Sequence, residues 1–449
     1  MPKRDVPPSR RPRPMGWMLP VSGRGRERIL FLMGPPSIFW RELSFALEEG
    51  GHSVFKINLN LGDAIWWRRR GAVAFRGRFA RWEAFLDRFV ADYGITQILY
   101  YADRQPYHIV AQRVAKRRGI DAFVLENGYL RPDWITLERN GMSLYSHFPS
   151  NPEQIRALAE KFPELNLSIQ YRHGFVIEMA SEICYNFLAR FYRFSYPLFR
   201  SGAYYNPFVE YFPGVVYKIS ARRREAVARR IVGTLSAARR PFYLCPLQLQ
   251  SDKQVLENSP FRHITAFIEQ VIASFAAYAP ADSVLLFKEH PHDNGVEKWA
   301  RRIGQIAMRF GIGERVEFIG GGDLGEILRH ARGCVLVNST VGLYALRAEV
   351  PTKALGTAIY DVPGLTDQRS LDDFWSDPSP VDMELLHALL RVMSGTVQVK
   401  GSFYDPVGRA AAIEEIVGRL GLGRVNGVAD AGCAPRLPGA CKGGKHDVW

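Results

Sequence analysis

The feature that most constrains the fold of this chain is an alternation of short apolar segments with amphipathic segments. In the first half, the apolar segments are RILFLMG (28–34), SVFKINLN (53–60), ITQILYYAD (95–103) and DAFVLENG (121–128). Segments with the spacing of amphipathic helices, such as 38–52 and 107–119, lie between them. This order is typical of parallel βαβ units.

The same alternation begins again after residue 239, with apolar segments at 240–248, 283–291, 315–320, 334–340 and 351–356. We therefore predict an α/β, GT-B-like fold with two Rossmann-like domains facing a central cleft. The predicted ranges are 28–238 for the N-terminal domain, with helical insertions rich in aromatics and arginine, 239–400 for the C-terminal domain and 401–424 for a terminal helix. Other two-domain α/β families share this outline, so the fold alone does not give the function.

The two ends of the chain differ in composition from these domains. Residues 1–27 are basic and proline-rich without an apolar core, so we expect a disordered tail and not a secretory signal. Residues 425–449 are glycine-rich and are also expected to be disordered. No apolar stretch is long enough to cross a bilayer. The five cysteines are scattered and form no CxxC pair, which favours reduced thiols in the cytoplasm over disulfides or a zinc site.

The net charge of +14 predicts an anionic partner. Two segments, Trp66–Trp82 and Phe187–Arg200, interleave arginines with large aromatics, a combination that suits the interface of an acidic bilayer. Amphipathic helices packed on a core, with solvated arginines, would give the same pattern. No nucleic-acid-binding signature is present, so nucleic acid is not the expected partner.

Parallel sheets bind ligands at the carboxyl ends of their strands, so the loops there hold the candidate site residues. The first loop, GPPSIFWR (34–41), matches neither GxGxxG nor a P-loop, although its backbone could present N–H groups to an anion. Two further loops, ADRQPYH and ENGYLRPDW, carry the candidates Asp103, Arg104, His108, Glu126, Asn127, Gly128 and Arg131.

The second domain has three such loops. PLQLQSDKQ contributes Gln250, Ser251 and Asp252; KEHPHD contributes Lys288, Glu289, His290 and Pro291; NSTVGLYAL contributes Asn338, Ser339, Thr340 and Gly342. Hydroxyls and free N–H groups where a helix begins favour a phosphate.

Each candidate also has an ordinary structural interpretation, such as a helix cap, a turn residue or a surface acid. The histidine spacing matches no common metal site, so we predict none. The functional hypothesis depends on the conjunction, because each loop follows its own strand and a central cleft would bring them together.

The motifs ENGYLRPDWITLE, PLQLQSD, KEHP and NSTVGLYAL resemble those of the bacterial capsule polysaccharide biosynthesis and export family, over roughly residues 28–405. Characterised members are β-Kdo transferases that use CMP-Kdo, a nucleotide-activated acidic ketose. The most similar branch begins the poly-Kdo linker of the capsule on a phosphatidylglycerol-type lipid. The resemblance therefore implies a retaining glycosyltransferase with CMP-Kdo as donor substrate, no cofactor and an anionic lipid acceptor.

The same resemblance implies roles for the candidate residues. Retention at the anomeric carbon needs a carboxylate nucleophile, for which Asp252 is the choice, with Glu126 as base for the acceptor hydroxyl; the two roles are interchangeable at this point. His290 is expected to donate to the departing phosphate. The other candidates of the second domain would bind the donor, and the first-domain loops would serve the acceptor. The sequence departs from the family pattern at Asn127, where a second acid is common, and at Lys253.

Two alternative functions remain at this stage. The first is a sialyltransferase-like enzyme that uses another CMP-activated acidic sugar. The second is a non-catalytic adaptor that binds glycolipid and other capsule synthesis or export proteins. We expect a cytoplasmic protein that is peripheral to the inner face of the cytoplasmic membrane.

Overall fold

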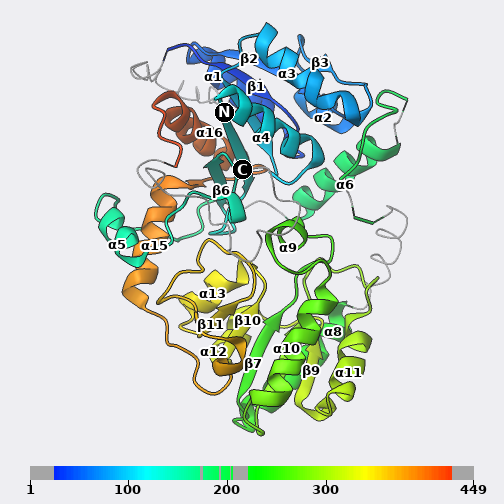
Figure 1. Cartoon of the computed structure of the whole chain (residues 1–449), viewed down its shortest axis with the longest axis vertical. Coiled ribbons are helices and arrows are strands. Elements are labelled where there is room, and N and C mark those ends of the chain that lie inside the picture. Colours follow the sequence, from blue (N-terminus) through cyan, green and yellow to red (C-terminus); the bar gives the residue numbers. More distant parts are fainter. Residues whose placement is uncertain (1–24, 172–174, 192–193, 203, 206–220, 427–449) are drawn as a thin grey trace, which may run out of the picture.

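The computed structural model describes residues 25–171, 175–191, 194–202, 204–205 and 221–426; of residues 175, 176, 190 and 191 it describes the backbone only. Nearly all of both predicted tails lies outside these residues. The chain forms two α/β domains that lie one above the other along the long axis of the molecule (Figure 1).

The first domain contains a seven-stranded sheet with the order β12-β6-β5-β4-β1-β2-β3. Its strands are β1 (Arg28–Phe31), β2 (Ser53–Asn58), β3 (Val73–Ala74), β4 (Gln97–Tyr101), β5 (Asp121–Asn127), β6 (Trp134–Arg139) and β12 (Gln398–Lys400). Its main helices are α1 (Phe39–Glu49), α2 (Leu61–Trp67), α3 (Trp82–Asp92), α4 (Pro106–Arg118) and α16 (Pro406–Gly421). Short 3₁₀ turns occupy Phe79–Arg81 and Ser143–Tyr145.

Apolar side chains cover both faces of the first sheet. On one face, strand residues such as Leu30 and Ile98 pack with α3 and α4 around Trp82. On the other face, Ile29 and Leu99 pack with α1 and α16. Because both faces are buried, the parallel strands are nearly continuous apolar runs, which is why they were recognisable in the sequence.

The second domain contains a five-stranded, all-parallel sheet with the order β11-β10-β7-β8-β9. Its strands are β7 (Phe242–Pro246), β8 (Val284–Lys288), β9 (Val316–Ile319), β10 (Gly333–Leu336) and β11 (Thr352–Ala354). Its helices are α8 (Ala221–Ala237), α9 (Lys253–Asn258), α10 (Ile264–Tyr278), α11 (Trp299–Arg309), α12 (Leu324–His330), α13 (Val341–Arg347), α14 (Leu371–Phe374) and α15 (Met383–Thr396), with a 3₁₀ turn at Gly313–Arg315. Separate apolar clusters on its two faces complete the core.

The predicted GT-B-like class is confirmed, with two differences in detail. Strand β6, which the sequence analysis did not predict, pairs antiparallel with β5, placing Asn127 opposite Ile135. Strand β12 then pairs antiparallel with β6. Residues 398–400 therefore belong to the first sheet, so the chain returns to the first domain before the predicted boundary at residue 400. Helix α16 follows and packs against α1 through the ion pair between Arg409 and Glu42.

The strand order shows where each sheet can bind a ligand. In the first sheet the order reverses between β1 and β4, and in the second between β7 and β10. Loops at such a reversal leave on opposite faces and open a crevice at the carboxyl edge of the sheet. Loops from both crevices line one cavity between the domains.

Helices α5 (Pro152–Ala159) and α6 (Phe175–Phe191) belong to the segment that joins the domains. Helix α6 lies beside the junction of the domains (Figure 1) and packs on α2, where the Asn60 amide donates to the Tyr185 hydroxyl over 3.0 Å. Within the described ranges, every helix is too short or too polar to span a bilayer.

Candidate active site

The interdomain cavity has a volume of about 560 Å³. The ends of β1, β4 and β5 and helix α6 form its walls on one side, and the loops after β7, β8 and β10 form them on the other. Nine of the predicted residues line it: Glu126, Asn127, Arg131, Ser251, Asp252, His290, Asn338, Ser339 and Thr340. The rule that parallel sheets bind ligands at the carboxyl ends of their strands (the strand-end rule) therefore selected residues of both domains that line one cavity.

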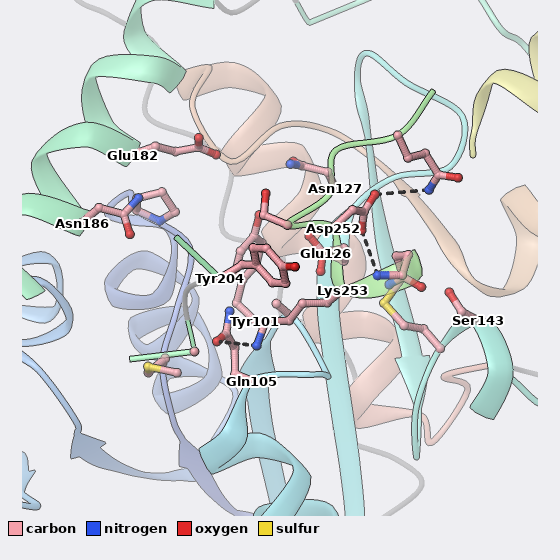
Figure 2. A pocket seen from close by; sticks show the side chains of 18 of the residues that line it. Tyr101, Gln105, Glu126, Asn127, Ser143, Glu182, Asn186, Tyr204, Asp252 and Lys253 are labelled. Atoms are coloured by element: carbon pink, nitrogen blue, oxygen red, sulfur yellow. Dashed lines mark hydrogen bonds between the residues drawn. The ribbon is translucent and has the colours of Figure 1, made fainter. Parts of the chain in front are cut away.

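Asp252 enters the cavity from the start of α9 (Figure 2). Its Oδ1 accepts from the backbone N–H of Gln254 over 2.8 Å, which caps the helix, and its Oδ2 accepts from Nε2 of Gln248 over 3.2 Å. Burial raises the pKa of Asp252, and these two hydrogen bonds oppose the rise. The carboxylate is therefore held by both oxygens and still faces the cavity.

Gln248 links Asp252 to the neighbouring strand end. Its Nε2 also donates to Oδ1 of Asn338 over 3.0 Å, and its Oε1 accepts from the Asn338 backbone N–H over 3.2 Å. The Asn338 amide nitrogen donates in turn to the carbonyl oxygens of Gln254, over 2.8 Å, and Asn258. This network ties the β7 and β10 loops together, and Asn338 serves as a structural support within it.

Glu126 lies at the end of β5, across the domain junction from the Asp252 loop, and Figure 2 shows both in the same cavity. Burial, followed by the charge of Asp103, raises the pKa of Glu126 to about 7; Arg131 opposes the rise and Asp252 adds to it. A carboxyl group with this pKa can exchange a proton near neutral pH, as a general base must.

The ring of His290 is held in one tautomer. Its Nδ1 lies 3.1 Å from the backbone N–H of His292 and accepts from it, so the proton of the neutral ring is on Nε2. Burial, then the neighbouring His292, lowers the pKa of His290 to about 3. His290 is thus a neutral N–H donor on the cavity wall, suited to a phosphate oxygen and not to carrying a full positive charge.

Ser339 and Thr340 line the cavity directly before α13. Thr340 occupies the N-cap position but its side chain makes no capping bond, whereas Ser339 Oγ accepts from the Val341 backbone N–H over 3.2 Å. Tyr360 lies beneath this turn and donates from its hydroxyl to the Ser339 carbonyl. A Cβ on Gly342 would overlap the Tyr360 ring, so Gly342 acts by allowing this approach.

The loop that carries Arg131 is held from both domains. The Gly128 backbone N–H donates to the Trp134 carbonyl over 2.8 Å, and a Cβ at Gly128 would overlap that carbonyl group. The Tyr129 backbone N–H donates to Gln398 Oε1 over 2.8 Å, and the Tyr344 hydroxyl of α13 donates to the Arg131 carbonyl over 3.3 Å. The glycine is therefore required by close packing and not by a left-handed backbone.

Three predicted residues of the first domain lie behind the cavity wall and do not line it. Asp103 and Arg104 form a buried ion pair over 3.2 Å, and Arg104 covers the ring of Tyr145. His108 is fully buried, stacks on Tyr100 and contacts the Ala102 carbonyl through Nδ1; burial lowers its pKa to about 3. These three residues, predicted to serve the acceptor or its loop, therefore do not line the cavity, because the loop after β4 and the start of α4 bury them in the core.

In the second domain, the predicted donor-binding residues that do not line the cavity are Gln250, Lys288, Glu289, Pro291 and Gly342. Gln250 is 2% exposed and accepts from the Ile264 backbone N–H, so it supports the loop. Lys288 and Glu289 are buried at the end of β8, where Glu289 lies 3.9 Å from Arg224. These five residues therefore do not line the cavity in which the donor is expected to bind.

Several polar residues line the cavity that the sequence analysis did not select: Tyr101, Gln105, Glu182, Asn186, Tyr204, Gln248 and Lys253. Four of them flank the predicted motifs, and the strand-end rule extended by one or two residues would have found them. Glu182 and Asn186 are on α6, and Tyr204 is on the segment after it, where the sequence offered no such signal. Figure 2 shows α6 presenting Glu182 and Asn186 to the cavity.

Lys253 crosses between the domains. Its Nζ donates to the Arg104 carbonyl over 3.0 Å and lies 3.4 Å from Gln105 Oε1. Burial lowers the pKa of Lys253, and the charge of Glu257 opposes this. No group of three or more His, Cys, Asp or Glu side chains with the arrangement of a metal site occurs in the described parts of the chain.

Comparison with known proteins places this site in context. The pattern of the capsule polysaccharide biosynthesis protein family matches residues 96–404. The capsule polysaccharide modification protein LipB of Neisseria meningitidis serogroup B is 31% identical over 399 residues, which are 85% of this chain and 92% of that protein. The capsule polysaccharide export protein KpsS of Escherichia coli is 30% identical over 385 residues, covering 84% and 97%. Among solved structures, the β-Kdo 2,7 transferase KpsC of Thermosulfurimonas dismutans aligns over 87% of this chain and 99% of its own, with a TM-score of 0.43 and 14% identity.

Proposed function

The chain belongs to the capsule polysaccharide biosynthesis family, and we propose that it is a retaining glycosyltransferase that moves Kdo from CMP-Kdo to a phosphatidylglycerol-type lipid. This reaction would begin the linker on which the capsule polysaccharide is built. The observation that carries the proposal is the meeting of Asp252 and Glu126, from different domains, in one cavity with the neutral donor His290.

In the first step, a carboxylate oxygen of Asp252 attacks the anomeric carbon of Kdo. The bond from that carbon to the CMP phosphate oxygen breaks, and its electron pair leaves with the phosphate. His290 donates a hydrogen bond from Nε2 to a phosphate oxygen, and the hydroxyls of Ser339 and Thr340 lie on the same side of the cavity. Donors fixed in advance stabilise the charge that develops on the leaving group.

In the second step, Glu126 takes the proton of an acceptor hydroxyl as its oxygen attacks the anomeric carbon. The bond to Asp252 breaks and its electron pair returns to the carboxylate. Two inversions give net retention. The raised pKa of Glu126 supports the base role for Glu126, and the two hydrogen bonds to its carboxylate support the nucleophile role for Asp252.

We place the acceptor phosphate beside Arg131, a cationic side chain that lines the cavity. The two basic aromatic segments of the sequence lie next to each other near this region: Arg76 Nε donates to the Ser195 carbonyl over 2.9 Å, and the Arg200 guanidinium lies 4.8 Å from the Phe79 ring.

We propose that the surface around these segments contacts the anionic inner face of the cytoplasmic membrane. Phe194 is 87% exposed there, and the outer side of the adjoining helix α6 exposes Ile183 and Phe187. Exposed arginines of the first segment accompany them, namely Arg68, Arg70, Arg76, Arg78 and Arg81. Exposed apolar groups beside cations are what an acidic bilayer interface binds.

The test is release of CMP from CMP-Kdo with a short-chain phosphatidylglycerol acceptor, comparing wild type with Asp252→Asn and Glu126→Gln. We expect acceptor-dependent release and a β-linked product in the wild type, and loss of both in the variants. Release with CMP-sialic acid instead of CMP-Kdo would replace the sugar in the proposal. Lipid binding without turnover of either donor would exclude the transferase and support an adaptor.

A further inference from the structure

Helix α6 presents two polar side chains to the cavity that the proposed mechanism does not use. Glu182 and Asn186 are four residues apart, so they lie one helical turn from each other on the same face. Both line the cavity, and Figure 2 shows them pointing into it. Neither makes a hydrogen bond or an ion pair with another residue within the described ranges.

The surroundings of Glu182 disfavour a negative charge on its carboxyl group. Burial and the like charge of Glu178, one turn earlier on α6, raise the pKa of Glu182 to about 7, and Arg131 opposes the rise. A carboxyl group of this kind can both accept and donate hydrogen bonds near neutral pH. A phosphate or carboxylate of a ligand would be repelled from this wall and would lie toward Arg131.

The position of α6 identifies which substrate reaches this wall. The helix packs on α2 of the first domain, through Tyr185 and Asn60, while the candidate phosphate donors His290, Ser339 and Thr340 come from the second domain. A donor whose CMP phosphate contacts the second domain would leave the α6 wall to the acceptor.

We propose that Glu182 and Asn186 form a subsite for a vicinal diol, the glycerol headgroup of the acceptor lipid. The inference rests on the proposed function. A vicinal diol offers two donors and two acceptors on adjacent carbons, and a carboxyl group with an amide one turn away matches this set. The subsite would select a polyol headgroup and turn one hydroxyl toward Glu126.

The experiment compares two short-chain lipids, phosphatidylglycerol and an analogue whose headgroup is 1,3-propanediol and thus lacks the middle hydroxyl. The proteins are wild type, Glu182→Gln, Asn186→Ala and the control Cys184→Ala, which changes an exposed residue on the same helix that does not line the cavity. The measurements are kcat/KM for each acceptor, KM for the donor, and CMP release without acceptor.

We expect the wild type and Cys184→Ala to prefer the glycerol headgroup by roughly 10-fold or more, the effect of losing one well-placed hydrogen bond in a site built for it. The two α6 variants should lose this preference through a higher acceptor KM, whereas Cys184→Ala should keep the donor KM and the acceptor-free CMP release of the wild type. A preference that survives in both variants, or that is absent from the wild type, would overturn the subsite.

A second measurement separates this proposal from the proposed function. Calorimetric binding of the same two lipids in the absence of donor needs no catalysis. If no CMP-sugar is turned over but the wild type still binds the glycerol lipid more tightly than the analogue, and Glu182→Gln does not, the subsite stands while the transferase assignment falls. Equal binding of both lipids to the wild type would reject the subsite even in an active enzyme.

Discussion

Gln248 donates a hydrogen bond to Asp252 over 3.2 Å, and through the same amide nitrogen it reaches Asn338, on the loop that follows β10, over 3.0 Å. The proposed nucleophile is therefore oriented by a residue that is itself held by the neighbouring strand end. Gln248 is 5% exposed, so bulk water cannot readily replace it.

Replacing Gln248 with Ala should lower kcat by roughly 10-fold or more, because the carboxylate loses both its orientation and one hydrogen bond that favours its charged form. The pKa of Asp252, followed through its carboxyl signal in an NMR titration, should rise. Gln250→Ala is the matched control, since Gln250 supports the same loop but does not line the cavity. The control should lower the melting temperature without raising the pKa of Asp252; an equal rise in both variants would count against a positioning role.

Asp252 caps helix α9, so its structural and chemical roles must be separated. Asn is as good an N-cap as Asp, whereas Ala is not. We expect Asp252→Asn to keep the stability of the wild type but to lose activity by about 10³-fold or more, as removal of a nucleophile does. Asp252→Ala should lose the same activity and about 1 kcal/mol of unfolding free energy as well. Retained turnover in Asp252→Asn would reduce the residue to a helix cap.

Much of this fold follows from the sequence, because strands buried on both faces are apolar runs that alternate visibly with helices. Strand β6 pairs with β5, which directly precedes it in the chain, and on its other side with β12 far along the chain, where Gln398 donates to Thr136 over 2.9 Å; the sequence analysis predicted neither pairing. The strand-end rule found Glu126 and Asp252. It also selected His108, because no sequence pattern shows that this side chain turns into the core. Glu182 escaped the rule since a helix contributes it, and only packing decides which of its faces meets the cavity.

The raised pKa of Glu126 predicts opposite effects on activity and stability. As a base, Glu126 must be deprotonated, so kcat/KM should rise with pH through about 7. Its folded-state pKa is above the unfolded value, so folding is favoured while the group is protonated, and this contribution is lost as pH rises from about 4.5 through about 7. Glu126→Gln should therefore be inactive, and it should melt at a higher temperature than the wild type at pH 8 but not at pH 4.5. An equal difference in melting temperature at both pH values would contradict the assignment.

The turn before α13 depends on close packing between Gly342 and Tyr360. Gly342→Ala should cost about 1–3 kcal/mol, because the new methyl group displaces the tyrosine ring that holds the Ser339 carbonyl. The donor KM should rise as the Ser339–Thr340 turn moves. Gly418→Ala, in open space on α16, is the control and should stabilise the protein by about 0.5–1 kcal/mol. Thermal melting and donor kinetics measure both effects, and an unchanged donor KM in a destabilised Gly342→Ala protein would remove this turn from the donor site.

The exposed surface of the first domain should bind anionic membranes through two separable contributions. Phe194→Ser removes an exposed ring and should weaken binding to vesicles that contain phosphatidylglycerol at all salt concentrations. A double change of Arg78 and Arg81 to Glu should weaken binding mainly at low salt, because screening already reduces the electrostatic part at high salt. Met308→Ser, which removes a 68% exposed apolar side chain from α11 of the second domain, should bind like the wild type.

Co-sedimentation with anionic vesicles and with neutral phosphatidylcholine vesicles measures the membrane binding of each variant. Turnover of a short-chain acceptor should remain normal in all three variants, since none of these residues lines the cavity. Equal binding by all proteins to both kinds of vesicle would show that this surface is not the one that meets the membrane.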